Sequence, residues 1–183
     1  MLSKSRYSHS TNKTLLTVTA KPYMIQLSNK HKVTSNLFIM VQEKLMLLHQ
    51  MLPSNSIYNI SHVSDNDPMY CTASGKLTLA NMTEDALKAY LKSIELTPSS
   101  PFTITTQEAL LKSLEEIKRL GYSYENQELG EGVSAISVPI YNKSGTLFGA
   151  ISACGISSYI VRIHDAIVTD FKCASKRITK EMF

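Results

Sequence analysis

The amino-acid sequence predicts an α+β domain in which helices pack on an antiparallel sheet. The first observation is an apolar hairpin within residues 121–155, where two strand-like segments flank a turn at Asn142–Gly145. The second is another apolar hairpin over residues 33–51. The third is a set of segments whose apolar residues recur at helical spacing, over residues 13–32, 83–94, 105–120 and from residue 157 onward. Hairpins join antiparallel strands, and the helices supply the layers that cover the sheet.

The composition fits one ordinary globular domain. A chain of 183 residues, with 43% hydrophobic and 19% charged residues, is long enough for one well-packed core and short for two. The net charge of +4 is too small to indicate a nucleic-acid-binding surface, which needs clustered Lys and Arg. No apolar run approaches the roughly 20 residues that span a bilayer, so no membrane partner is expected.

Chemistry-bearing motifs are scarce. The sequence has no G-x-S-x-G motif, no glycine-rich phosphate loop and no zinc-ligand spacing, so neither an enzyme, nor a cofactor, nor a metal is expected. Cys71, Cys154 and Cys173 form no C-x-x-C pair, which indicates reduced thiols and a cytoplasmic location. His62 could share a metal with Cys71 and Cys154, but buried thiols that act as small apolar side chains are the favoured interpretation.

The first third of the chain begins with a polar segment. Residues 1–12 show no apolar period and predict a disordered tail, so the domain is expected over residues 13–183. A helix follows, with Pro22 either starting or kinking it. The hairpin then has strands over residues 33–41 and 45–51, and a polar loop after it contains a short strand-like segment, Ile57–Ile60.

The middle of the chain is mainly helical. Ser74 and Gly75 interrupt the pattern after Tyr70, and a helix is expected from Leu77 to Ala80. Ser74 has two interpretations that are compatible: it caps this helix, or it helps the helix start to bind an anion. The next two helices are expected to begin at the caps Thr83 and Thr105, the second with Glu108 in a capping box and with Gly121 at its end.

The central hairpin is the segment around which the domain is organised. Its first strand alternates small and apolar residues from Val133 to Ile140, which suits a strand covered on both faces. Its second strand, Thr146–Cys154, carries the small residues Gly149, Ala150, Ser152 and Ala153. Small residues on a central strand leave room for a ligand or for another backbone, and spacing alone favours tight packing against a helix.

Several short segments together carry a family resemblance. They are Pro68–Lys76 (PMYCTASGK), Leu96-Thr97-Pro98, Thr103-Ile104-Thr105, Arg119–Tyr122 and the central hairpin. In order and spacing the chain resembles the C-terminal, effector-binding domain of the IclR family of bacterial transcription regulators, over about residues 15–183. The resemblance implies a PAS/GAF-like effector-binding domain. Members usually place a winged helix-turn-helix before this domain, and no such segment is present in this sequence, so the chain alone is not expected to bind DNA directly.

The resemblance also implies a ligand pocket between the Thr-Ala-Ser-Gly-Lys loop and the central hairpin. Carried over position by position, the ligand-binding residues are Ala73, Ser74, Gly75, Glu125, Ala135, Ser152 and Cys154. The ligand is expected to be a small organic acid, since a carboxylate needs a few hydroxyl and backbone N–H donors in a mostly apolar hollow.

Three of these positions depart from the family pattern. Glu125 stands where Asp is common, Ala135 where many members have Cys, and Cys154 where Ser is frequent. The departures leave the identity of the ligand open and weigh against a metal.

The first functional interpretation is a ligand-sensing domain that binds a small metabolite and controls DNA binding or assembly of its regulator. The alternative is a stand-alone protein-interaction domain with a degenerate pocket, which associates with an intact regulator. A homodimer or homotetramer is expected, because the hairpin of residues 33–51 is strongly apolar and the resemblance points the same way.

Overall fold

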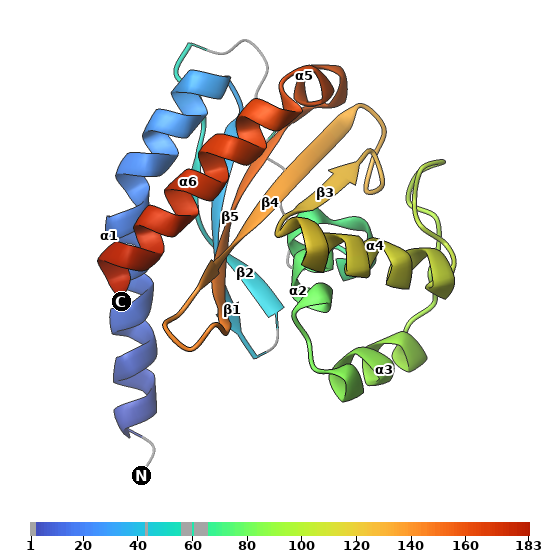
Figure 1. Cartoon of the computed structure of the whole chain (residues 1–183), viewed down its shortest axis with the longest axis horizontal. Coiled ribbons are helices and arrows are strands. Elements are labelled where there is room, and N and C mark those ends of the chain that lie inside the picture. The colour runs from blue at the N-terminus through green and yellow to red at the C-terminus, as the bar shows by residue number, and fades with distance from the viewer. Residues whose placement is uncertain (1–2, 43, 56–59, 61–65) are drawn as a thin grey trace.

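A computed structural model describes residues 3–42, 44–55, 60 and 66–183, with side chains from residue 11 onward. Its centre is a five-stranded antiparallel sheet with the strand order β2-β1-β5-β4-β3 (Figure 1). The strands are β1 Thr34–Val41, β2 Lys44–Met51, β3 Ser123–Asn126, β4 Val133–Tyr141 and β5 Leu147–Ile156. The predicted α+β class and both predicted hairpins are confirmed.

Helices cover both faces of the sheet. The long helices α1 (Ser3–His31) and α6 (His164–Met182) lie side by side on one face, as Figure 1 shows. The shorter helices α2 (Ala73–Ala80), α3 (Glu84–Ser93) and α4 (Gln107–Leu120) lie on the other side, after a short 3-10 turn at Met69–Cys71. A further short helix, α5 (Ser157–Arg162), precedes α6. Each face of the sheet therefore has its own apolar core.

Strand alternation divides the apolar side chains between the two cores. Leu37 and Ile39 of β1 point toward α1 and α6, whereas Phe38 between them points toward α2 and α4. On β5 the small residue Ala150 lies opposite Phe38 and faces the α2 side. This alternation decides which side chains of β1 and β5 can face a pocket under α2.

The start of α4 and the presence of strand β3 differ from the sequence prediction. Thr83 caps α3 and Gly121 ends α4 with a φ of 69°, as predicted. The cap of α4, however, is Thr106 and not Thr105, because the Thr106 hydroxyl accepts the N–H of Ala109 at 3.3 Å. Strand β3 was missed, since its sequence, Ser-Tyr-Glu-Asn, is short and polar and carries no apolar alternation.

The two terminal helices also differ from expectation. Helix α1 begins at Ser3 instead of residue 13 and continues through Pro22. No Gly or Pro interrupts residues 3–12, so nothing in the backbone chemistry stops the helix there. At the other end, the predicted final helix is divided at Ile163 into α5 and α6.

The division of the chain at residues 12 and 13 remains a prediction. The strand expected at Ile57–Ile60 falls largely outside the described residues. None of the described helices is both long enough and apolar enough to cross a membrane.

Candidate functional site

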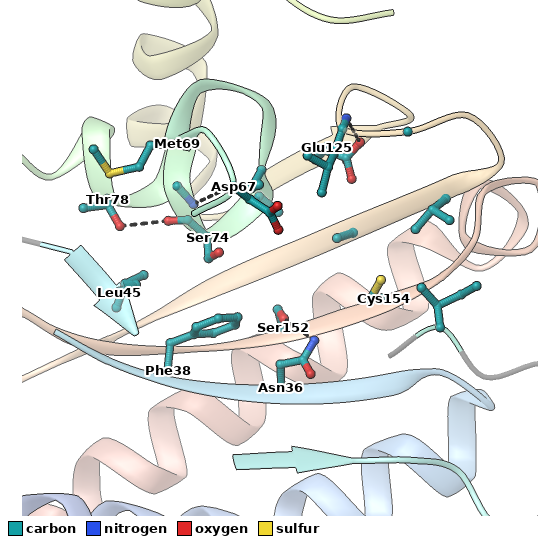
Figure 2. Close-up of a pocket in the computed structure, with 18 of the residues that line it drawn as sticks. Asn36, Phe38, Leu45, Asp67, Met69, Ser74, Thr78, Glu125, Ser152 and Cys154 are labelled. Atoms are coloured by element: carbon teal, nitrogen blue, oxygen red, sulfur yellow. Dashed lines mark hydrogen bonds between the residues drawn. The ribbon is translucent and has the colours of Figure 1, made fainter. Parts of the chain in front are cut away.

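A pocket of about 420 Å³ lies between the N-terminal end of α2 and the middle of the sheet (Figure 2). All seven residues that were predicted as ligand-binding line it: Ala73, Ser74, Gly75, Glu125, Ala135, Ser152 and Cys154. The remaining lining residues are Asn36, Phe38, Lys44, Leu45, Ile60, Asp67, Met69, Thr72, Thr78, Leu129, Gly130 and Val133. The structure thus brings the predicted loop and the predicted strand pair together around one cavity.

The sheet forms the floor of the pocket in three successive rows. Residues directly opposite each other on antiparallel strands point to the same face, so each row is a set of neighbouring side chains. The first row pairs Phe38 with Ala150 and the second pairs Asn36 with Ser152. The third row runs from Cys154 through Ala135 to Glu125. The floor therefore changes from apolar at Phe38, through amide and hydroxyl, to the carboxyl group of Glu125.

The roof of the pocket is the first turn of α2. Thr72 is the N-cap of this helix, and its hydroxyl accepts the N–H of Gly75 at 3.0 Å. The helix begins at Ala73, so the expected start at Leu77 was four residues late and Ser74 is not the cap. The N–H groups of Ala73 and Ser74 belong to the first helical turn and have no acceptor within the helix. These donors and the positive end of the helix dipole favour a negatively charged group beside Ser74.

A chain of hydrogen bonds crosses the floor from the sheet edge. Gln50 on β2 donates its side-chain N–H to Asn36 Oδ1 at 2.8 Å, and Asn36 Nδ2 donates to Ser152 Oγ at 3.4 Å. Asn36 is 2% exposed and Ser152 is 3% exposed. Because Ser152 accepts in this chain, its own hydroxyl hydrogen is free to donate. Asn36 was missed in the sequence, although a polar residue ahead of the apolar run Leu37–Val41 was the signal that could have found it.

Glu125 closes the far end of the pocket. Its side-chain oxygen Oε1 accepts the N–H groups of Glu128 at 2.5 Å and Leu129 at 3.3 Å. Burial raises the pKa of the Glu125 carboxyl from 4.5 to about 7, and the two backbone N–H groups lower it only in part. At neutral pH this group is therefore divided between its neutral and charged forms, and it can accept a hydroxyl donor from a ligand.

A buried ion pair joins the roof to the edge of the floor. Lys76 on α2 is 1% exposed, and its Nζ donates to the Tyr124 carbonyl oxygen at 2.9 Å and to the Glu128 carboxylate. Glu128 follows β3 and directly precedes Leu129, which lines the pocket. Removal of either partner would leave an uncompensated buried charge, so this pair fixes α2 relative to β3.

The two thiols near the pocket are buried. Burial raises the pKa of Cys71 to about 11 and that of Cys154 to about 12, so both stay protonated at neutral pH. The thiolate is the nucleophilic form of cysteine, so both thiols are weak nucleophiles at neutral pH. The third residue of the metal alternative, His62, lies outside the described residues. Within the part of the chain that the structure describes, no three His, Cys, Asp or Glu side chains are grouped as a metal site.

Comparison with known proteins gives the same family from sequence and from fold. The family model described as bacterial transcriptional regulator IclR C-terminal matches residues 8–179. The regulator KdgR of Escherichia coli K12 is 33% identical over 132 residues, which are 70% of this chain and 49% of that protein. The Pca regulon regulatory protein of Pseudomonas putida is 25% identical over 151 residues, 82% and 51% of the two chains. The chain spans about half the length of these curated relatives.

Solved structures agree with this assignment. The C-terminal domain of E. coli KdgR matches with a TM-score of 0.78 and 27% identity, over 92% of this chain and 98% of that one. The Thermotoga maritima IclR matches with a TM-score of 0.80 and 26% identity, over 91% and 68%. A double mutant of the inducer-binding domain of the transcription factor PobR from Acinetobacter, in complex with 3-hydroxybenzoic acid, shares the fold with a TM-score of 0.77 and 19% identity, over 87% of this chain and 95% of that one. The resemblance drawn from the sequence is confirmed: over most of its length this chain is a C-terminal effector-binding domain of the IclR family of bacterial transcription regulators.

Proposed function

We propose that this domain senses a small organic acid in the pocket under α2 and passes its occupancy to the DNA binding or assembly of a regulator. The observation that carries the proposal is the pocket itself, which has donors on both its roof and its floor. The family consists of transcription regulators and not of enzymes, which directs the proposal toward binding without catalysis.

The polar groups suggest how an acid would lie. A carboxylate between the start of α2 and the Asn36–Ser152 row would meet backbone N–H groups, the Ser152 hydroxyl and the free hydrogen on Asn36 Nδ2. A hydroxyl group on the same ligand would face Glu125, which lies in the next row of the floor and two strands across from Ser152. The double mutant of the PobR domain, which shares this fold, was solved in complex with an acid that also carries a hydroxyl group, and this supports the same combination here.

A bound ligand would transmit its presence by contacting both the roof and the floor of the pocket. The first turn of α2, which forms the roof, and the sheet, which forms the floor, face each other across the pocket, and the Lys76–Glu128 pair holds α2 to the segment after β3. A ligand that contacts both the roof and the floor binds most tightly to the arrangement in which they are closest. Binding therefore shifts the population of the domain toward that arrangement, and the size of the shift is set by the difference between the ligand's affinities for the two arrangements.

The alternative, a stand-alone interaction domain with a degenerate pocket, has less support because the cavity is large and lined by donors.

Association of copies is proposed together with ligand sensing. Strand β2 forms one edge of the sheet, and Met46 and Leu47 on it are 38% and 37% exposed. An apolar sheet edge suits a homodimer or homotetramer. We also propose a cytoplasmic location, because the cysteines are free and thiols stay reduced in the cytoplasm.

A thermal-shift screen tests the ligand-sensing proposal. The chain is heated with a panel of organic acids and with the amide of each acid as a matched neutral control. A true ligand raises the melting temperature by mass action in proportion to ln(1 + [L]/Kd). We expect at least one acid to stabilise the chain more than its amide does. A panel in which no acid does so would contradict an organic-acid effector and favour the interaction domain.

A further inference from the structure

The end of the pocket opposite Glu125 is apolar. Phe38 from β1, Leu45 from β2 and Met69 from the turn before α2 line it, and Figure 2 shows Phe38 and Leu45 away from Glu125 with Ser74 and Ser152 between them. The Thr78 hydroxyl at this end already donates to the Ser74 carbonyl oxygen at 2.9 Å. A ligand group placed here therefore meets mainly hydrocarbon and thioether surface, and the charged side chain nearest to it in the chain is Lys44, which precedes Leu45 on β2 and also lines the pocket.

The strand register sets how far this end lies from the polar row. Phe38 and Asn36 are two residues apart on β1 and point to the same face, so they are separated by about 7 Å along the strand. A carboxylate held at Asn36 and Ser152 reaches Phe38 only through an arm of several carbon–carbon bonds. An acid of two or three carbon atoms would occupy the polar row and leave the apolar end empty.

We propose that the effector of this domain is an acid with an apolar arm, whose carboxylate lies at the Asn36–Ser152 row and whose arm lies against Phe38, Leu45 and Met69. The proposal rests on the proposed function, since it names the class of ligand for the same pocket.

Two physical arguments favour such a ligand over a polyhydroxylated acid of equal size. An apolar arm removes its own surface and that of Phe38 and Leu45 from water, which stabilises the complex. A hydroxylated arm at the same place would lose hydrogen bonds to water and find few partners, which costs binding free energy. A volume of about 420 Å³ is within the range of pockets that enclose medium-sized organic ligands, so an arm has room.

The first test compares acids that share one head group and differ in the arm. Thermal shifts of the full chain are measured at pH 6 with acetate, pyruvate, gluconate, hexanoate and phenylacetate, and with hexanamide as the neutral control. We expect hexanoate or phenylacetate to give the largest shift and hexanamide a smaller one. A larger shift with gluconate or pyruvate would overturn the apolar arm while leaving the organic-acid function intact. An equal shift with hexanamide would overturn the carboxylate position, and no shift with any acid would contradict the proposed function as well.

A pair of variants then locates the arm. Leu45→Ser removes half-buried apolar surface from the proposed arm site, and Leu52→Ser makes the same change at an exposed position outside the pocket. We expect Leu45→Ser to weaken hexanoate binding at least about threefold and to leave acetate binding unchanged. Leu52→Ser should change neither. Equal hexanoate affinities in the two variants would show that the arm does not lie at Leu45.

Discussion

The backbone of Met69 passes so close to Gly75 that a Cβ atom at position 75 would overlap the Met69 carbonyl oxygen. The Thr72 hydroxyl, which caps α2, lies equally close to that position. The family resemblance placed Gly75 among the ligand-binding residues. The structure adds a packing reason, because only glycine lets the turn at Met69–Cys71 lie against the first turn of α2.

Gly75→Ala should therefore destabilise the domain before it affects a ligand. We expect a loss of about 1–3 kcal/mol in the free energy of unfolding, the range for overpacking at a rigid site. Gly130→Ala is the matched control, since Gly130 also lines the pocket but a Cβ atom there would meet nothing within 4 Å. Urea unfolding of both variants measures the difference, and equal stabilities would show that the loop before α2 moves aside at little cost.

Gln50 should influence ligand binding without lining the pocket. Its side chain holds Asn36 Oδ1 at 2.8 Å and so turns Asn36 Nδ2 toward Ser152. Gln50→Leu frees the Asn36 amide to rotate, and we expect binding of an acid to weaken several-fold while Gln50→Leu chains remain folded.

A double-mutant cycle separates this positioning role from a general loss of structure. In an Asn36→Ala background, Gln50→Leu should have no further effect on the dissociation constant, because its partner is already gone. An undiminished effect of Gln50→Leu in that background would contradict positioning through Asn36.

The features of this domain that the sequence predicts correctly are those that depend on residues close together in the chain. The turn at Asn142–Gly145, the end of α4 at Gly121 and the shared face of Ser152 and Cys154 all follow from glycine chemistry or from strand periodicity. The seven candidate positions came from the family resemblance, and all of them line one pocket.

The unpredictable part depends on contacts between distant segments. Thr72 and Ser74 both belong to residue types that cap helices well. Thr72 is the cap because the turn at Met69–Cys71 ends directly before it, so that α2 begins at Ala73. Strand β3 is too polar to be recognised alone and exists because it pairs with β4. Asn36 becomes a pocket residue only when β1 pairs with β5, and the sequence does not encode that pairing locally.

Glu125 should make the stability of the domain depend on pH. Its carboxyl has a pKa of about 7 in the folded chain against 4.5 when exposed, because burial disfavours the charged form. Between these values the folded chain binds a proton that the unfolded chain releases, so stability falls as pH rises from about 4.5 to about 7 and stays lowered above. The loss attributable to Glu125 is about 3 kcal/mol at most.

Urea unfolding at pH 5 and pH 8 for the wild type and Glu125→Gln measures this contribution. Glutamine keeps an oxygen to accept the Glu128 and Leu129 N–H groups and cannot ionise. The wild type should lose more stability than Glu125→Gln between the two pH values. Identical losses would mean that the Glu125 carboxyl is not titrating in this range.

The edge strand β2 should carry an interface between copies. In sedimentation velocity at tens of micromolar, we expect the wild type to be a dimer or tetramer. Replacing the exposed Leu47 with Lys should shift it toward monomer, because a charge on an apolar sheet edge opposes pairing. The same change at Leu111, exposed on α4, is the control. A wild type that sediments only as a monomer would rule out self-association at this concentration.

The central claim is that the cavity under α2 is the effector site, and filling it tests the claim most directly. Ala135 lies on the pocket floor between Cys154 and Glu125, so Ala135→Leu places a larger side chain inside the cavity. Ala109→Leu makes the same change at an exposed position on α4. The measurement is titration calorimetry with the acid that gives the largest thermal shift. We predict one binding site per chain in the wild type and in Ala109→Leu, and loss of binding in Ala135→Leu with the melting temperature preserved. Equal affinity in Ala135→Leu and the wild type would place the effector site elsewhere.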